Sequence, residues 1–222
     1  MTASKAASPG TVSAAGRIVR HATIDRVFHW VSALCVLTLL ATAFLPILGV
    51  EFAWVDVHWV TGLVLILAVL VHIVRALLVQ ELKPIWIGMA DLREAAAIVR
   101  STLRRDVAGT PKPGKYSFAQ KLIHLAFALV VLTALATGGA MLARIDTPWW
   151  PRNPYLLTAD TWGMIYVLHD LAALVLITMV MMHVYFALRP EKWPFTRAMI
   201  RGWITRAEYS EHHDPQRWQV DP

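Results

Sequence analysis

The sequence predicts an all-α integral membrane protein built as a four-helix bundle. Of its 222 residues, 57% are hydrophobic and only 16% are charged, whereas about 25% of the residues of a soluble domain are charged. Four runs without a charged side chain each reach the ~18 apolar residues that indicate a membrane-spanning helix. They are Val27–Val50, Val57–Val74, Leu122–Ala143 and Leu171–Leu188. This pattern excludes a soluble enzyme, a secreted disulfide-bonded scaffold and a protein with a single membrane anchor.

The runs and the segments between them predict the order of the elements. We expect membrane helices over about residues 25–50, 57–80, 117–143 and 161–188, inside a domain of residues 21–190. Residues 1–20 lack a compact signal-peptide pattern and predict a disordered tail. Residues 84–105 mix apolar and charged side chains as an amphipathic helix on the membrane surface does. Residues 191–222 are expected to form a C-terminal tail that is solvated or in contact with a partner. The single cysteine, Cys35, is expected to be a small packing residue.

The basic residues indicate the orientation of the helices. Of the 21 Lys and Arg residues, only Arg144 and Arg152 lie in the connections that follow the first and third runs. By the positive-inside rule, both termini and the central loop are then cytoplasmic. The net charge of +6 therefore reflects membrane topology, and no nucleic-acid partner is expected because no basic module interleaved with aromatic residues is present.

Six of the nine histidines fall within or at the ends of the apolar runs, where polar side chains are costly and usually functional. In this topology two lie in the outer layer and four in the inner layer: His58 and His169 outside, and His29, His72, His124 and His183 inside. The second and fourth helices each carry two histidines fourteen residues apart. Fourteen residues return a helix to within about 40° of the same face, about 21 Å further along.

One helix face with imidazoles at two depths is what two stacked b haems (protohaem IX) require, because each takes one histidine from each of two facing helices. The outer pair is then His58 and His169. For the inner pair, spacing alone favours His72 with His183. The alternative is that these histidines bridge helices by hydrogen bonds or relay protons. A zinc or iron site is disfavoured, because the two layers are about 21 Å apart and lack a carboxylate cluster.

Several segments resemble a known family in their order and spacing. They are Thr23-Ile-Asp-Arg-Val-Phe-His-Trp30, His58-Trp-Val-Thr-Gly62, Lys115-Tyr-Ser-Phe-Ala-Gln-Lys121, the helix with His169 and His183, and the tail Arg197-Ala-Met-Ile-Arg-Gly-Trp-Ile-Thr-Arg206 followed by Glu211-His-His-Asp-Pro215. From about Arg20 onward, the chain resembles the di-haem cytochrome b (gamma) subunit of membrane-bound respiratory formate dehydrogenases. This subunit belongs to a superfamily of prokaryotic b-type cytochromes that includes those of Ni-Fe hydrogenases.

The resemblance implies a set of site residues. The histidine of the Asp-Arg-x-x-His-Trp motif is a ligand in that family, so the inner haem would be held by His29 and His183 and the outer haem by His58 and His169. The resemblance assigns no ligand role to His72 and His124. They would be groups next to the haem ligands, quinone-binding groups or proton relays. Residues at the start of the third helix help to bind quinone in that family, and the candidates here are Tyr116, Ser117 and Gln120.

The resemblance also implies partners and a location. The chain would span the bacterial cytoplasmic (inner) membrane several times and would not itself oxidise a substrate. On the periplasmic side, a molybdenum or tungsten catalytic subunit would oxidise formate and an iron–sulfur subunit would pass electrons to the outer haem. Membrane quinone would accept them near the cytoplasmic face, and the complex could assemble into a higher-order oligomer.

Three other functions stay open from the sequence. The chain could be the cytochrome b subunit of a hydrogenase or of a thiosulfate-reductase-type complex, or a stand-alone b-type cytochrome:quinone oxidoreductase. A haem-free, histidine-rich proton or metal transporter is the alternative from a different class.

Overall fold

The computed structural model describes residues 10–12, 16–79, 84–104 and 112–220. The chain divides into two compact units. The bundle unit comprises Phe28–Arg75 and Ala126–Val184, and the tail unit comprises Met1–Val27, Ala76–Leu125 and Tyr185–Pro222.

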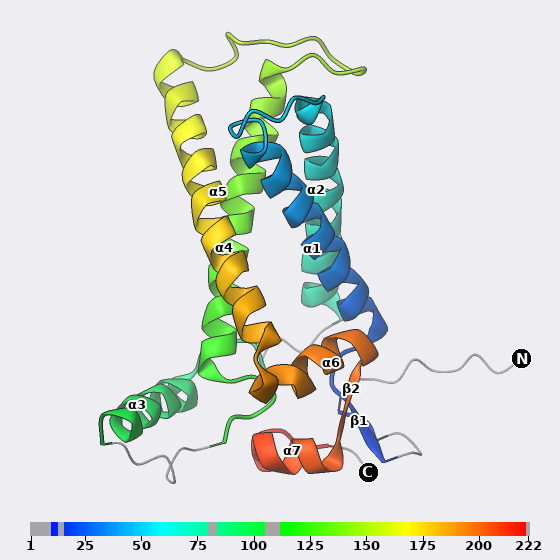
Figure 1. Ribbon diagram of the computed structural model, residues 1–222, viewed down its shortest axis with the longest axis vertical. Helices are drawn as coiled ribbons and strands as arrows, with labels where there is room; N and C mark the ends of the chain where they lie inside the picture. Colours follow the sequence, from blue (N-terminus) through cyan, green and yellow to red (C-terminus); the bar gives the residue numbers. More distant parts are fainter. Residues whose placement is uncertain (1–9, 13–15, 80–83, 105–111, 221–222) are drawn as a thin grey trace, which may run out of the picture. The chain divides into compact units, whose positions relative to one another are not determined.

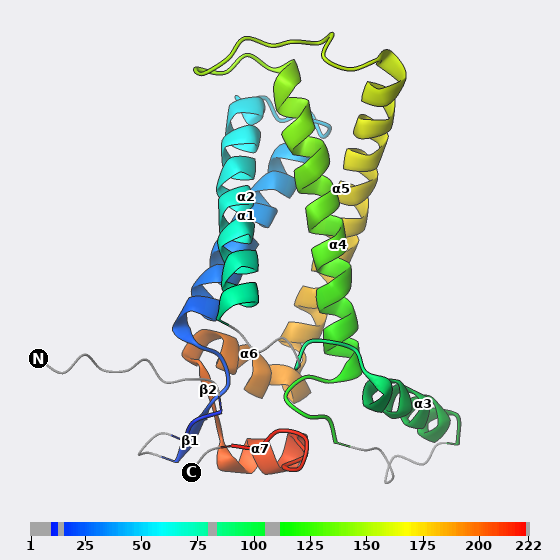
Figure 2. The ribbon, with the colours of Figure 1, turned by 180° about the vertical axis from the view of Figure 1, so that it is seen from behind.

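Within the described residues, four helices are long and apolar enough to cross a membrane (Figures 1 and 2). They are α1 (Thr23–Phe44), α2 (Trp54–Leu78), α4 (Phe118–Met141), which a short 3-10 helix η1 (Leu142–Arg144) extends, and α5 (Ala159–Leu188). The prediction of four such helices is confirmed. The largest difference is at the end of α1, which was expected to reach residue 50. It stops at Phe44 because Pro46 has no N–H to continue the helix, and Gly49 then turns the chain with φ of 87°.

The bundle unit has a small buried core and an apolar exterior. Five residues form the buried cluster: Cys35, Val36, Leu40, Leu65 and Leu176. Cys35 is therefore a packing residue, as predicted. Many large apolar side chains face outward, such as Leu34 at 69% and Leu129 at 68% exposure. Such a surface is unfavourable in water but suits helices surrounded by lipid tails, which are as apolar as leucine. The chain is a multi-pass membrane protein.

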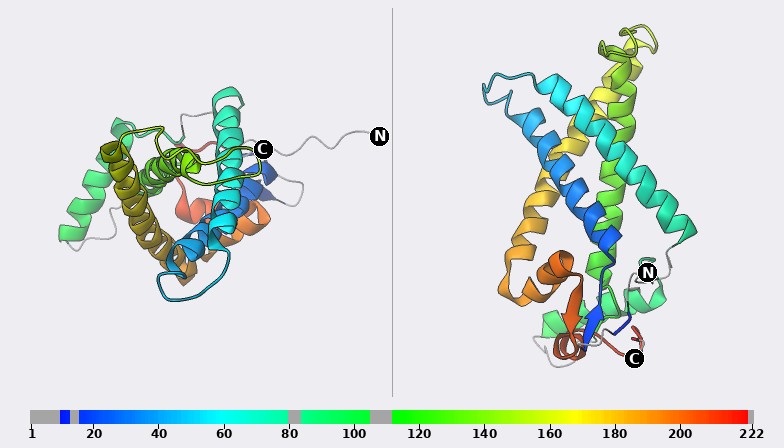
Figure 3. Two further views of the ribbon diagram at one scale, coloured as in Figure 1. Left: turned by 90° about the horizontal axis from the view of Figure 1, so that it is seen from above. Right: turned by 90° about the vertical axis from the view of Figure 1, so that its right-hand side faces the viewer.

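The tail unit is organised around a two-stranded antiparallel sheet (Figure 3). Strand β1 (Arg17–Val19) pairs with β2 (Trp203–Thr205), so that Ile18 lies opposite Ile204. These two side chains form a buried cluster with Ala198 and Trp218. The other elements of this unit are α3 (Met89–Arg104), η2 (Pro190–Lys192), α6 (Trp193–Arg201) and α7 (Arg206–His212).

The sheet corrects the expectation for both ends of the chain. Residues 17–20, expected in a disordered tail, form β1 and the buried residue Arg20, whereas residues 1–9 and 13–15 lie outside the described residues. The segment from residue 191 was expected to be solvated or bound to a partner, but it folds onto β1 and buries His213 at 2% exposure. Each strand has three residues and finds its partner near the other end of the chain, so local composition carries no sign of the pairing.

The predicted amphipathic segment over 84–105 is shorter than expected. Helix α3 begins at Met89, and residue 105 lies outside the described residues. Gly88 caps its first turn, because the Gly88 carbonyl accepts from the N–H of Asp91 and Leu92. In return, the Gly88 N–H donates to Asp91 Oδ2 at 2.8 Å. This reciprocal cap fixes where the helix starts.

A buried Arg–His pair joins three distant segments of the tail unit. The guanidinium of Arg20, which is 1% exposed, donates to His213 Nε2 at 2.7 Å and to the Lys115 carbonyl at 2.9 Å. Because the Gly114 carbonyl can only accept, His213 Nδ1, 2.6 Å away, carries the proton. His213 is therefore neutral. Burial and the adjacent Arg20 cation lower the pKa of His213 to about 4, and burial lowers the pKa of Arg20 to about 10.

We expect protonation of His213 to destabilise the protein in mild acid. In the unfolded chain the pKa of histidine is about 6.5, so between pH 6.5 and 4 the unfolded state binds the proton first. The stability from this group is thus complete above about pH 6.5 and is lost as the pH falls toward 4. The full shift corresponds to about 3 kcal/mol.

Thermal unfolding of the detergent-solubilised chain between pH 7.5 and 4.5 measures this effect. In His213→Gln, the amide can donate to Gly114 and accept from Arg20 without titrating, so its unfolding midpoint should fall less steeply with pH than that of the wild type. The neighbouring substitution His212→Gln is the control: it removes only the smallest of the causes that lower the pKa of His213 and should change the slope much less. Equal slopes for the wild type and His213→Gln would contradict the assignment.

Candidate functional site

The bundle unit brings four histidines together as two facing pairs. The ring centroids of His58 on α2 and His169 on α5 are 6.2 Å apart, with an interplanar angle of 69°. Those of His29 on α1 and His183 on α5 are 6.3 Å apart, with an angle of 47°. Helix α5 is continuous from Ala159 to Leu188, so its two histidines lie on one side of a single helix, about 21 Å apart along the axis. One helix thus contributes to both pairs.

Threonines fix the tautomer of both rings in the outer pair. Thr42 Oγ1 lies 2.8 Å from His58 Nδ1 and 2.9 Å from the Thr38 carbonyl. Thr137 Oγ1 lies 2.9 Å from His169 Nδ1 and 2.7 Å from the Thr133 carbonyl. Because a carbonyl can only accept, each threonine hydroxyl donates its single proton to the carbonyl and accepts a hydrogen bond from the imidazole. Nδ1 is therefore protonated in both rings, and Nε2 keeps a free lone pair, as a metal ligand must.

The inner pair has polar atoms left without a partner. His29 Nδ1 and Ser32 Oγ are buried and make no hydrogen bond within the part of the chain that the structure describes. They lie one turn apart on α1. Each ring of the pair has one edge-on aromatic contact. The ring centroids of Trp30 and His29 are 5.0 Å apart, and those of Phe127 and His183 are 5.8 Å apart. Buried polar atoms are normally paired, so these two point to a group that binds here.

The geometry of the two pairs fits the axial ligation of haem. Metal–imidazole nitrogen bonds are about 2 Å long, so one iron between two imidazoles separates their centroids by about 6 Å, which matches both pairs. No three His, Cys, Asp or Glu side chains converge on a metal position anywhere in the described ranges. A metal ion held by only two protein side chains must take its other ligands from a bound group, as haem iron takes them from the porphyrin.

Glycine residues keep space beside the rings. A Cβ on Gly138 of α4 would lie 3.1 Å from His169 Cε1, so any larger residue there would push this ring away from α4. A Cβ on Gly62, one turn beyond His58, would meet nothing within 4 Å. The space next to Gly62 is therefore open.

The remaining inner-layer histidines occupy different surroundings. His72 stacks on Phe28 with centroids 4.0 Å apart and an angle of 7°, and His124 is exposed in the tail unit. The partner that spacing favoured for His183 was His72, but the structure places His29 there. Fourteen-residue spacing fixes the angle of a residue about its own helix, while the neighbour across the bundle depends on how the helices cross.

Two of the three quinone candidates cap helix α4. Ser117 Oγ accepts from the Gln120 N–H at 3.3 Å, and Gln120 Oε1 accepts from the Ser117 N–H at 3.0 Å, which is a capping box. Tyr116 lies near two cations, with its ring centroid 5.7 Å from the Arg20 guanidinium carbon and 5.3 Å from Lys115 Nζ. Burial raises the pKa of Tyr116, so its phenol stays protonated and can donate a hydrogen bond.

Sequence reasoning found the four paired histidines but missed the threonines that hold them. Thr42 is sixteen residues from His58, and Thr137 is thirty-two residues from His169. Threonine is common in membrane helices, where its hydroxyl bonds to the preceding turn. Only the packing of α1 against α2 and of α4 against α5 gives these two residues a role.

Comparison with known proteins identifies the family. The model of the prokaryotic cytochrome b561 family matches residues 20–202. The cytochrome b556(fdo) subunit of formate dehydrogenase from Escherichia coli (strain K12) is 31% identical over 210 residues, which cover 90% of this chain and 91% of that protein. The cytochrome b556 subunit of formate dehydrogenase from Haemophilus influenzae is 26% identical over 217 residues, which cover 91% of this chain and 82% of that protein.

These matches cover all four membrane helices and both histidine pairs, and membership of a cytochrome b family implies haem b. The chain belongs to the prokaryotic cytochrome b561 family, in which it is similar to the cytochrome b subunits of formate dehydrogenases.

Proposed function

We propose that this chain is the membrane-anchoring electron-transfer subunit of a respiratory formate dehydrogenase, and that it passes electrons from an iron–sulfur subunit to quinone. The observation that carries the proposal is the presence of two facing imidazole pairs in the bundle unit, with centroids 6.2 and 6.3 Å apart. The names of the relatives supply the class of partner enzyme. Substrate oxidation belongs to a molybdenum or tungsten catalytic subunit.

In this proposal His58 and His169 are the axial ligands of an outer haem b, and His29 and His183 those of an inner one. Haem iron, when bound, takes up and releases one electron. Thr42 and Thr137 hold the outer rings so that each Nε2 is free to coordinate, and by accepting from Nδ1–H they raise the basicity of the ligands. The apolar core between the helices keeps water away from both sites.

The distribution of Lys and Arg supports an orientation with both termini in the cytoplasm. The outer pair then lies toward the periplasm, where the iron–sulfur and catalytic subunits dock. The inner pair lies toward the cytoplasm, in a chain that crosses the bacterial inner membrane four times.

Quinone is the proposed acceptor, near the start of α4. The Tyr116 phenol and the Gln120 carboxamide nitrogen are hydrogen-bond donors of the kind that a quinone carbonyl accepts. Ser117 supports them by capping the helix on which Gln120 lies.

The first test is a pyridine haemochrome assay on the detergent-purified chain together with its co-purifying subunits. We expect about two b haems per chain, because each imidazole pair can hold one. Iron–sulfur and molybdenum or tungsten should be found in the same preparation. A well-folded chain without haem would overturn the proposal in favour of a histidine-rich transporter.

Single histidine substitutions test the pairing. In His29→Ala the haem content should fall from two to about one per chain with the outer haem kept, because His183 loses its partner across the bundle. His72→Ala is the matched control on the same layer and should keep both haems, since His72 stacks on Phe28 instead. Loss of the inner haem from His72→Ala but not from His29→Ala would assign the ligand to His72.

The threonine contacts predict a shift in redox potential. In Thr137→Val the side chain keeps its size but His169 Nδ1–H loses its acceptor, so the ligand becomes less basic and stabilises oxidised iron less. We expect the midpoint potential of the outer haem to rise and its affinity to fall roughly tenfold. Redox titration followed by optical and low-temperature EPR spectra measures both haems separately. Thr178→Val on α5, whose hydroxyl donates to the Leu174 carbonyl of the same helix, is the control and should leave both potentials unchanged.

A further inference from the structure

Helix α3 presents an apolar stripe on the surface of the tail unit. At 100° per residue, Leu92, Val99 and Leu103 lie within about 20° of one line along the helix. Their side chains are 49%, 58% and 80% exposed. Trp86, which precedes the helix, is 68% exposed. An exposed apolar surface of this kind marks a contact with a partner or with a membrane.

Basic side chains run along one edge of the stripe. Arg93, Arg100 and Arg104 are exposed and lie roughly 80–120° from its centre line. The only two acidic residues of α3, Asp91 and Glu94, are buried at 4% and 3% exposure. The exposed surface of α3 therefore carries three positive charges and no negative one.

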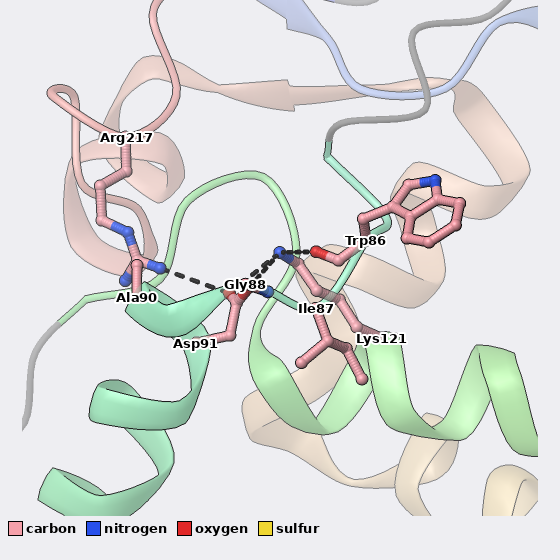
Figure 4. A pocket seen from close by; sticks show the side chains of 7 residues that line it. All are labelled: Trp86, Ile87, Gly88, Ala90, Asp91, Lys121 and Arg217. Atoms are coloured by element: carbon pink, nitrogen blue, oxygen red, sulfur yellow. Dashed lines mark hydrogen bonds and ion pairs between the residues drawn. The ribbon is translucent and has the colours of Figure 1, made fainter.

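Cations of the tail unit pair with both acidic residues of α3, and Figure 4 shows the pairing of Asp91 with Lys121 and Arg217. Both carboxylate oxygens of Asp91 accept from Lys121 Nζ at 2.9 Å, and Arg217 lies 3.5 Å from Asp91 and 2.7 Å from Glu94. Burial alone would raise the pKa of Asp91, but the Gly88 N–H, Lys121 and Arg217 outweigh it and hold the pKa below its usual value. Asp91 stays ionised, so this attachment of α3 persists at neutral pH.

The same ion pair attaches α3 to the start of α4. Lys121 is on the first turn of α4, the helix that begins a candidate membrane span at Phe118. Glu94 Oε1 also accepts from the Phe118 N–H at 3.4 Å. Helix α3 is thus bonded at two positions to the end of a candidate membrane span.

We propose that α3 lies in the membrane interface, with its apolar stripe among the acyl chains and Arg93, Arg100 and Arg104 bound to the headgroups of anionic phospholipids. Amphipathic helices with a basic edge bind such surfaces in this way. A protein surface as the occupant would have to be both apolar and acidic, whereas the bilayer is already present beside α4.

A spin-label experiment on the full chain in nanodiscs tests the depth of α3. In a Cys35→Ala background, Val99→Cys places a label on the stripe and Ser101→Cys places one on the opposite side of the helix. In nanodiscs of phosphatidylcholine with 30% phosphatidylglycerol, about the anionic content that attracts basic segments, label 99 should be relaxed by oxygen far more than by a water-soluble nickel chelate. Label 101 should not show this preference. A water-exposed label 99 would overturn the proposal.

The lipid charge and the arginines are then varied separately. In nanodiscs of phosphatidylcholine alone, or in the triple variant Arg93→Gln, Arg100→Gln and Arg104→Gln, label 99 should become more accessible to nickel. Each arginine lost should weaken docking roughly fivefold. Arg201→Gln with Arg206→Gln, two exposed arginines elsewhere in the tail unit, is the matched control and should have no effect.

Two further outcomes would overturn the proposal. If label 99 behaves the same with and without anionic lipid, the arginines do not bind headgroups. If label 99 is shielded from both oxygen and nickel, and the shielding depends on protein concentration in detergent, the stripe is a contact between copies of the chain.

Discussion

A histidine inside a bilayer needs a partner for each of its ring nitrogens, and the bundle unit is organised around this constraint. Lipid offers no hydrogen bonds, so an imidazole there must find them within the protein or on a bound group. In the outer pair, Thr42 and Thr137 satisfy Nδ1 and leave Nε2 with a free lone pair, and the two ring centroids lie 6.2 Å apart. These contacts fix the tautomer of both rings, which the proposed ligand role requires. Helix α5 contributes one imidazole to each of the two pairs.

The two pairs differ in how their polar atoms find hydrogen-bond partners. The threonines complete the outer pair, while His29 Nδ1 and Ser32 Oγ in the inner pair are buried without a partner among the described residues. A polar atom left in this way is costly unless a bound molecule satisfies it. In the proposed arrangement the two pairs would be different environments for the same cofactor, and a difference in hydrogen bonding to the ligand is one of the ways in which proteins separate haem potentials.

Buried charged groups in the tail unit likewise have partners within the protein. Arg20 is almost fully buried, yet its guanidinium donates to a neutral His213 and to a backbone carbonyl. Asp91 and Glu94 are buried against Lys121 and Arg217. A buried ion pair adds little to stability by itself, but removing one partner is costly. These pairs therefore act mainly to specify how the ends of the chain and α3 are attached. They also leave basic side chains as the only charged groups exposed on α3.

Uninterrupted apolar runs of membrane-spanning length led from the sequence to the four long helices, and the spacing of the histidines led to the outer pair. The end of α1 was misplaced because Pro46 lies inside an otherwise apolar run. The sheet between β1 and β2 was missed because each strand has three residues, too few to give a pattern. His213 looked like part of a solvated tail, since nothing near it in the sequence shows that Arg20 will lie beside it.

The sequence by itself determined that the chain crosses a membrane in four helices and that α5 carries two imidazoles on one side. Both properties follow from helical periodicity and from the free energy of placing residues in lipid, which depend on local sequence alone. Only the tertiary structure decided that His29 faces His183, that Thr42 and Thr137 hold the outer rings, and that Asp91 and Glu94 are withdrawn from the surface of α3. Each of these depends on which helices pack against one another, and the contacts that determine packing join residues far apart in the chain.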